Sequence, residues 1–298
     1  MKKFLFILVA VLLTGLVTFA QEEEVKEKDK PVTEPLGSGL LIDNQTIFIP
    51  QAKTLEFVIQ HRFGTMSNGI KDVWGIYNPG ANIRLGLNYV VINKLQVGYG
   101  LTMLNMTSDF SVKYNILEQT RKNTIPVFVM VYANMGIDGR NETAFGENYK
   151  FSNRFSYFSE LVVGRKFNDW FTFEARGNFT HFNMVAPGYD HDRVGIGFDA
   201  RLKFSPQSSL HLMYNVPLRI QSISENKTDN NEWEDLNYAY DNLGIGYEVN
   251  TGAHSFQIYV VSAKGILPQY NYIENPFEWT KGTHGLMFGF TMTRLWSY

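Results

Sequence analysis

Alternation of apolar and polar residues along many short segments is the feature that most limits what this chain folds into. The alternation is cleanest over residues 194–204, where Ile196 and Phe198 lie on one face and Asp199 and Arg201 on the other. A period of two puts successive side chains on opposite faces of a β-strand. The pattern therefore predicts strands whose two faces meet environments of different polarity.

About a dozen such segments follow one another through the chain, each roughly as long as a tilted strand that crosses a bilayer. The predicted strands are residues 54–64, 81–90, 94–103, 109–117, 124–135, 153–166, 170–182, 192–204, 209–219, 238–250, 253–263 and 283–296. One of them, 124–135, is apolar on both faces. The fold class they predict is all-β, a transmembrane antiparallel up-and-down β-barrel of about 12 strands.

The gaps between these segments form a second pattern. Gaps after odd-numbered strands tend to be long, as at 65–80, 136–152, 183–191, 220–237 and 264–282. Gaps after even-numbered strands are short, as at 91–93, 167–169, 205–208 and 251–252. Such alternation is typical of outer-membrane barrels, with long loops outside and tight turns in the periplasm. An even number of strands also places both chain ends on the periplasmic side.

The first residues have the composition of an export signal. Lys2 and Lys3 precede an apolar run, and Thr18 and Ala20 place small side chains where a signal peptidase cleaves. The run is short for a bilayer-spanning helix. We therefore expect residues 1–20 to be a signal peptide and the bacterial outer membrane to be the destination.

Between the signal and the first strand lies a segment of different character. Residues 21–53 are expected to form a polar periplasmic leader, of which 36–53 is a candidate to plug or cap one end of the barrel. Residues 54–298 are expected to be the transmembrane β-barrel. The last strand ends in the aromatic Tyr298. This ending predicts recognition by the barrel-assembly machinery, with outer-membrane lipid as the surrounding partner.

Composition narrows the function classes. The chain has 15% aromatic residues, a mean hydropathy of −0.18 and a net charge of −2. No segment after the signal has 18 consecutive apolar residues, which excludes membrane-spanning helices. The charge gives no sign of a nucleic-acid partner. The absence of cysteine excludes disulfides and thiolate metal ligands.

Charged residues on the polar faces are predicted to point into the lumen, because on the lipid face each Arg or Lys near the midplane would cost roughly 2–4 kcal/mol. The candidates are Glu56, Arg62, Arg84, Lys113, Glu174, Arg176, Asp199 and Arg201. Glu160, Lys203 and Glu248 fall on the same faces. Two alternatives stay open: a packed network of ion pairs that fills the barrel, and a lining that selects solutes.

Other constellations carry weaker signals. No cofactor is predicted, and no metal site, although the outer loop 188–192 places Asp190, His191 and Asp192 close together. Catalytic motifs such as Gly-x-Ser-x-Gly and His-Glu-x-x-His are absent. A membrane-embedded hydrolase would need a Ser–His pair on the wall, and neither His181 nor His211 has an obvious serine partner by period. The sequence therefore predicts that the protein is not an enzyme.

Several stretches resemble an uncharacterised family of bacterial outer-membrane β-barrel proteins, known only as a domain of unknown function. They are residues 54–64 with their His-Arg-Phe-Gly element at 61–64, and residues 82–89, 154–157, 164–167, 251–257 and 288–290. Together they span nearly all of the chain after the signal. The resemblance implies an outer-membrane barrel and carries no established activity.

These observations predict a channel or transporter-like protein for small solutes. The alternative is a closed barrel that acts as a scaffold or adhesin through its long outer loops. Aromatic-rich outer segments such as 238–240 and 268–279 suit contact with a partner. The width of the lumen separates these two interpretations.

Overall fold

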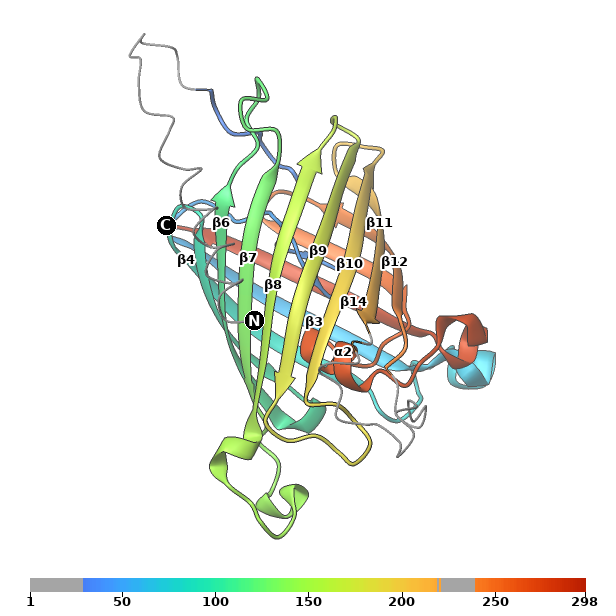
Figure 1. The fold of residues 1–298 in the computed structure, drawn as a ribbon. Helices are drawn as coiled ribbons and strands as arrows, with labels where there is room; N and C mark the ends of the chain where they lie inside the picture. Colours follow the sequence, from blue (N-terminus) through green and yellow to red (C-terminus); the bar gives the residue numbers. More distant parts are fainter. Residues whose placement is uncertain (1–28, 219, 221–238) are drawn as a thin grey trace. The chain divides into compact units, whose positions relative to one another are not determined.

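The structure of the protein is a computed structural model that describes residues 29–218, 220 and 239–298 (Figure 1). Residues 31–298 form one compact unit. The predicted signal peptide and most of the predicted loop 220–237 lie outside the described residues. No helix within the described residues is long and apolar enough to cross a membrane.

Twelve long strands form the wall, as the sequence predicts. They are β3 (Thr54–Thr65), β4 (Asn82–Ile92), β5 (Leu95–Thr102), β6 (Thr107–Leu117), β7 (Phe128–Ile137), β8 (Phe155–Lys166), β9 (Phe171–Phe182), β10 (Asp192–Lys203), β11 (Ser208–Leu218), β12 (Asn242–Asn250), β13 (His254–Val261) and β14 (Met287–Ser297). Each strand pairs antiparallel with its neighbours in the chain, and β14 pairs with β3 to close the barrel. The predicted up-and-down topology is confirmed.

Three predicted strands begin four residues too early: 124–135, 238–250 and 283–296 correspond to β7, β12 and β14, which start at Phe128, Asn242 and Met287. A proline explains the first of these differences. The expected strand 124–135 is β7, which starts at Phe128 and ends at Ile137. Pro126 has no backbone N–H to donate to a neighbouring strand, so it is disfavoured inside a ladder. Just before it, Thr120 and Ile125 close a tight loop through a backbone hydrogen bond of 2.9 Å. The chain therefore enters the wall only after the proline.

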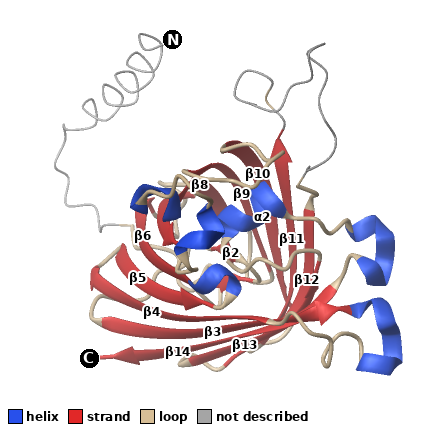
Figure 2. Ribbon diagram, turned by 90° about the horizontal axis from the view of Figure 1, so that it is seen from below, coloured by secondary structure: helices blue, strands red, loops and turns tan. Residues whose placement is uncertain are grey.

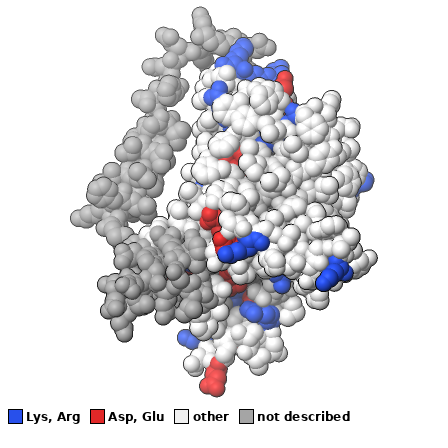
Figure 3. All heavy atoms as spheres, turned by 90° about the vertical axis from the view of Figure 1, so that its right-hand side faces the viewer, with Lys and Arg blue, Asp and Glu red and all other residues white. Residues whose placement is uncertain are grey.

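On most wall strands the two faces are reversed relative to a soluble protein. On β10, the outward Phe198 and Leu202 are 41% and 42% exposed, whereas the inward Asp199 and Arg201 are 1% and 6% exposed. Much of the outer wall in Figure 3 carries neither Lys/Arg nor Asp/Glu side chains. An apolar outer face with buried charges inside is the arrangement of a barrel that stands in lipid.

The two ends of the barrel differ in their connections. The long connections carry short helices: η1 (Met66–Asp72), η3 (Glu142–Phe145), η4 (Phe151–Arg154), α2 (Pro268–Glu274) and η6 (Trp279–His284). We call this end the loop end, which is at the bottom of Figure 1, and the opposite end the turn end. The connection from β5 to β6 departs from the predicted alternation. It holds only η2 (Leu104–Met106), because Asn105 and Met106 adopt φ values of 56° and 49° and turn the chain within a few residues.

Residues 31–53, which we call the plug, run from the turn end into the barrel, and most residues from 35 to 50 are buried there. The plug enters at the turn end, where Pro31 forms a β-bridge with Thr120 of the β6–β7 connection. It then folds into a hairpin of β1 (Leu40–Leu41) and β2 (Asn44–Gln45). Seen from below, β2 and α2 lie within the ring of strands (Figure 2). The sequence analysis did not predict β1 and β2.

The plug builds a hydrophobic core inside the lumen. Leu41, Ile42 and Ile47 are at most 1% exposed, and they form one buried cluster with inward side chains of the wall and with Tyr272 of α2. Wall glycines leave room for this core: a Cβ at Gly164 would lie 2.8 Å from Ile47 Cδ1. The barrel is therefore packed inside as a folded domain is, with a filling made by its own chain.

Candidate functional site

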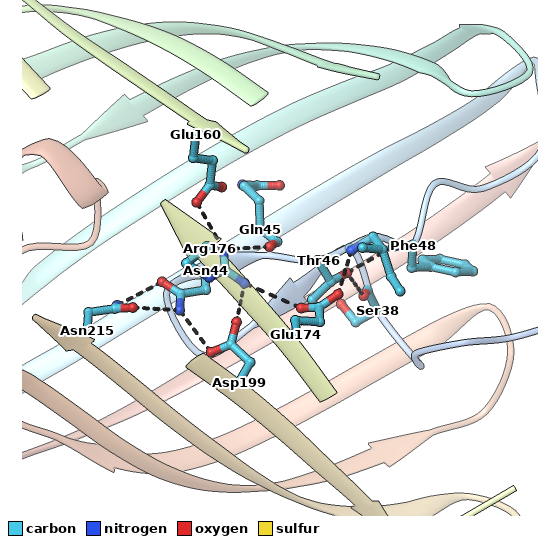
Figure 4. Close-up of polar contacts among 12 residues, drawn as sticks. Ser38, Asn44, Gln45, Thr46, Phe48, Glu160, Glu174, Arg176, Asp199 and Asn215 are labelled. Atoms are coloured by element: carbon cyan, nitrogen blue, oxygen red, sulfur yellow. Dashed lines mark hydrogen bonds and ion pairs between the residues drawn. The ribbon is translucent and has the colours of Figure 1, made fainter. Parts of the chain in front are cut away.

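The densest polar group in the lumen surrounds Arg176 on β9. Its guanidinium donates to Glu160 Oε2 at 3.0 Å and to Glu174 Oε2 at 3.3 Å, and it also binds Asp199 (Figure 4). The fourth acceptor is the plug carbonyl of Gln45, at 2.9 Å. All four charged side chains are at most 3% exposed. One cation therefore faces three carboxylates, and these carboxylates need further donors.

Donors of the plug complete this group. Asn44 Nδ2 donates to Asp199 Oδ1 at 2.9 Å, and the amides of Asn44 and Asn215 bond each other in both directions at 3.0 and 2.9 Å. The backbone N–H of Ile47 donates to Glu174 Oε1 at 2.8 Å. Figure 4 shows these contacts converging on the plug from several wall strands. The wall carboxylates are satisfied partly by the plug.

Lys113 on β6 holds the plug from another side. Its Nζ donates to the carbonyls of Gly39 at 3.1 Å and Phe48 at 3.0 Å, on either side of the hairpin. Two strand positions further on, Asn115 Nδ2 donates to the carbonyl of Ile47 at 3.0 Å. A buried ammonium group with backbone acceptors keeps its charge solvated by dipoles.

Arg62 joins three parts of the chain. It is fully buried, pairs with Asp43 of the plug and donates to the carbonyl of Ala263 in the last long connection. Its guanidinium lies 5.4 Å from the ring centre of Tyr259. The preceding residue of the His-Arg-Phe-Gly element points outward, where His61 stacks on Phe290 at 5.3 Å.

Arg84 belongs to a group that reaches α2. It makes a two-pronged ion pair with Asp109, at 2.9 and 2.6 Å. Asn134 Nδ2 donates to the same carboxylate at 3.1 Å, and Gln269 of α2 donates to Asn134 Oδ1 at 2.8 Å. A bidentate Arg–carboxylate pair fixes the geometry of both partners.

The remaining candidates lie in separate groups. Glu56 accepts hydrogen bonds from Asn88 at 2.8 Å and Gln96 at 2.9 Å. Arg201 Nη2 lies 3.7 Å from Glu248 Oε1. All eight residues expected in the lumen have buried side chains on the inner side of the wall. Only Glu174, Arg176 and Asp199 form a single ion-pair group.

Uncharged amides of the lumen escaped the sequence analysis. Gln257 of β13 accepts from the Ile42 N–H at 3.0 Å and donates to the Leu40 carbonyl at 2.7 Å, so one side chain pairs with the plug backbone as a strand would. Asn115 likewise donates to the plug backbone, whereas Asn44 of the plug and Asn215 of the wall bond each other through their side-chain amides. The alternation along its strand places Gln257 on the inner face, and this pattern could have identified it as a lumen residue.

A Ser–His contact exists inside the wall, contrary to the expectation that His211 lacks a serine partner. Ser209 Oγ lies 3.2 Å from His211 Nε2, and Glu248 Oε1 lies 3.7 Å from the same nitrogen. A triad needs its serine and its carboxylate on opposite ring nitrogens. Here both face Nε2, so the arrangement fits an ion-pair group and not a nucleophile with its base.

The outer segment 188–192 does not gather ligands. His191 Nδ1 bonds the Phe182 carbonyl at 2.6 Å, and Asp192 Oδ1 bonds His181 Nδ1 at 2.6 Å. In the part of the chain that the structure describes, no group of three or more His, Asp or Glu side chains is arranged to hold a metal ion.

The wall, the plug and α2 together define a class of protein: a closed, membrane-bound β-barrel whose lumen is filled by its own chain. The family model described as "Membrane bound beta barrel domain (DUF5777)" matches residues 37–296. The chain belongs to this family. The match begins within the plug, so the family includes most of the filling as well as the wall.

Solved structures that match the chain include an outer membrane channel from Pseudomonas putida F1, with 10% identity, 84% of this chain and 97% of that chain covered, and a TM-score of 0.47. The NanC porin matches with 9% identity, 82% and 99% covered, and a TM-score of 0.46. LpxR from Salmonella typhimurium matches with 9% identity, 82% and 100% covered, and a TM-score of 0.39. The search of curated proteins finds no match.

Proposed function

We propose that this protein is an outer-membrane barrel that passes small solutes when the plug is displaced, and that the described state is the closed one. In this proposal residues 1–20 direct export, the barrel-assembly machinery inserts the wall, and the loop end faces outward. The eight predicted lumen residues become the lining of the open path. No catalytic step is assigned.

One observation carries the proposal: charged and amide side chains of the wall bond to the backbone of the plug. Lys113, Arg176 and Gln257 each bond plug carbonyls, and Gln257 also bonds a plug N–H. Such hydrogen bonds contribute about 0.5–1.5 kcal/mol each and are exchangeable for water. Displacing the plug would leave a wall with charges of both signs facing an aqueous space, which suits polar solutes.

The experiment is conductance of the refolded mature protein in planar bilayers, with and without a weakened plug. Gln257→Leu removes two hydrogen bonds to the plug, so the closed state loses about 1–3 kcal/mol. We expect open events to become roughly tenfold more frequent than in the wild type. Gly164→Ala, which places a methyl group against Ile47, should act in the same direction.

Gln60→Leu is the matched control. Gln60 is also a buried inward glutamine, 2% exposed, and within the described residues its side chain bonds Arg84 at 3.2 Å and no plug atom. The control should gate as the wild type does. Silence of Gln257→Leu and Gly164→Ala in correctly folded, heat-modifiable barrels would contradict the channel proposal.

A second candidate function is a closed scaffold that binds a partner through its loops. The observation that favours it is the pair η1 and η6, which contact each other and expose Ile70 at 76% and Trp279 at 38%. The predicted contact segment 268–279 contributes less than expected. Residues Gln269–Ile273 of α2 are buried in the barrel mouth, because their aromatic and amide side chains pack against the wall and the plug core.

A further inference from the structure

A cavity of about 410 Å³ opens at the loop end. It is lined in part by α2 and by no residue of the plug. Its sides are formed by α2 and by the β5–β6, β7–β8 and β9–β10 connections. Phe182 and Tyr270 meet edge to face at 5.3 Å and belong, with Tyr189, to one hydrophobic cluster. A volume of this size suits a small ligand, and the cavity offers it an aromatic surface.

One side of the cavity carries a guanidinium held in place. Arg140 binds both oxygens of Asp138 through Nε at 3.1 and 3.0 Å, and Nη2 adds a third bond of 2.6 Å. Asp138 is 10% exposed, whereas the Arg140 side chain remains 41% exposed. The carboxylate therefore fixes the guanidinium while leaving part of it open to a ligand.

A carboxylate without a direct partner lines the same cavity. Within the described residues, no hydrogen bond or ion pair engages Glu274, the last residue of α2. Burial raises the pKa of Glu274, and the nearby positive charge of Arg140 opposes that rise without a direct contact. A partly buried carboxylate in aromatic surroundings gains stability from a cation.

We propose that this cavity binds a small zwitterion with an apolar body, of the size of an amino acid. Its ammonium group binds Glu274 and its carboxylate binds Arg140. Its side chain packs on Tyr189, Tyr270 and Phe182. Arg140 and Glu274 line one cavity, but Arg140 pairs with Asp138 and not with Glu274, so a zwitterion would bridge the two opposite charges. The site does not rest on the channel proposal, because binding at the mouth is measurable whether or not the barrel conducts.

The test is calorimetric titration of the mature protein in lipid nanodiscs with three matched probes. Phenylalanine carries both charges, N-acetylphenylalanine lacks the cation, and phenylalaninamide lacks the anion. We expect saturable binding of phenylalanine and affinities at least about tenfold weaker for each of the other probes, since a charged hydrogen bond is lost. Absence of saturable phenylalanine binding to the folded protein would overturn the site.

Two variants assign the roles. Glu274→Gln should weaken phenylalanine about tenfold or more and remove its advantage over N-acetylphenylalanine. Arg140→Lys keeps the charge but loses the fork, so it should weaken phenylalanine while leaving phenylalaninamide unchanged. Glu278→Gln, on the nearby outer connection beyond the cavity lining, is the control and should bind as the wild type does. Equal phenylalanine affinity in Glu274→Gln and wild type would contradict the assignment.

Discussion

At the scale of single residues, the lumen shows how charges are kept inside a membrane protein. Arg176 alone does not balance Glu160, Glu174 and Asp199, and the deficit is met by N–H donors of the plug. Removing one member of a buried ion-pair group leaves the others uncompensated, which costs more than the pair itself contributes. The wall and the plug are therefore coupled through individual side chains.

Arg176→Gln measures this coupling. The variant leaves three buried carboxylates without their shared cation, so we expect a loss of about 3–5 kcal/mol in the free energy of unfolding. Denaturant unfolding in lipid vesicles, followed by tryptophan fluorescence, gives the value. Arg294→Gln is the control, because Arg294 points outward and is exposed. A loss at Arg176 no larger than the loss at Arg294 would argue against the coupling.

Ligand binding at the mouth should depend on pH through Glu274. Burial raises the pKa of Glu274 above its ordinary 4.5, so in acid its charge is lost earlier than that of an exposed glutamate. The charged and titratable groups that line the cavity with Glu274 are Arg140, Arg154, Asp138, Tyr189 and Tyr270. The hydrogen bonds that Arg140 donates to Asp138 raise the pKa of Arg140, and burial raises the pKa of both tyrosines, so Arg140 stays charged and the tyrosines stay neutral.

Affinity for phenylalanine should therefore be full at neutral pH and fall as the pH drops through the raised pKa of Glu274. Titrations between about pH 7 and pH 4 measure the profile. In Glu274→Gln the affinity should be low and flat over the same range. A wild-type profile as flat as that of the variant would exclude Glu274 as the ammonium partner.

At the scale of secondary-structure elements, the two apolar faces of β7 are explained by what lies on each side of the strand. Its inward residues Phe128, Met130 and Tyr132 belong to the plug core, whereas Val129 and Val131 face outward. A strand between lipid and a hydrophobic core is apolar on both faces. The apolar residues on both faces of the predicted strand 124–135 thus reflect the hydrophobic core inside the barrel, which the sequence alone did not reveal.

Met130→Ala tests that core. Met130 is fully buried, so truncation should cost about 2–5 kcal/mol in the free energy of unfolding. The adjacent Val131→Ala removes only outward methyl groups and should cost about 1.5 kcal/mol or less. Unfolding midpoints in vesicles give both values. Equal costs would mean that the inner face of β7 is not packed as described.

The wall strands were predictable, and residues 36–53 were expected to plug or cap one end, but the hairpin and contacts of the plug were not predictable, for a physical reason. Strand alternation is local, so each wall strand from β3 to β14 is encoded within its own residues. The contacts of the plug join residues far apart in the chain, such as Ile42 with Gln257 and Asn44 with Asp199. The two-residue alternation of the strands predicted that charged residues such as Arg62 point inward. Their partners, such as Asp43, lie in a segment that has no such alternation.

At the scale of the whole molecule, the orientation of the barrel has a direct test, because the chain has no cysteine. A single cysteine at Ile70, on the exposed η1, should react with a membrane-impermeant maleimide in intact cells. A cysteine at Gln207, in the exposed β10–β11 turn, should react only after the outer membrane is permeabilised. The reverse labelling pattern would place the loop end in the periplasm.

The position of the plug in the chain also sets an order of events during biogenesis. Because residues 31–53 precede β3, synthesis delivers the filling before any wall strand exists. The ring closes only when β14, the last strand, pairs with β3, to which the plug is directly joined. Inserting a hairpin into a finished ring would require desolvating its backbone in a crowded interior. We therefore expect the wall strands to pair around the plug, instead of the plug entering a barrel that has already closed.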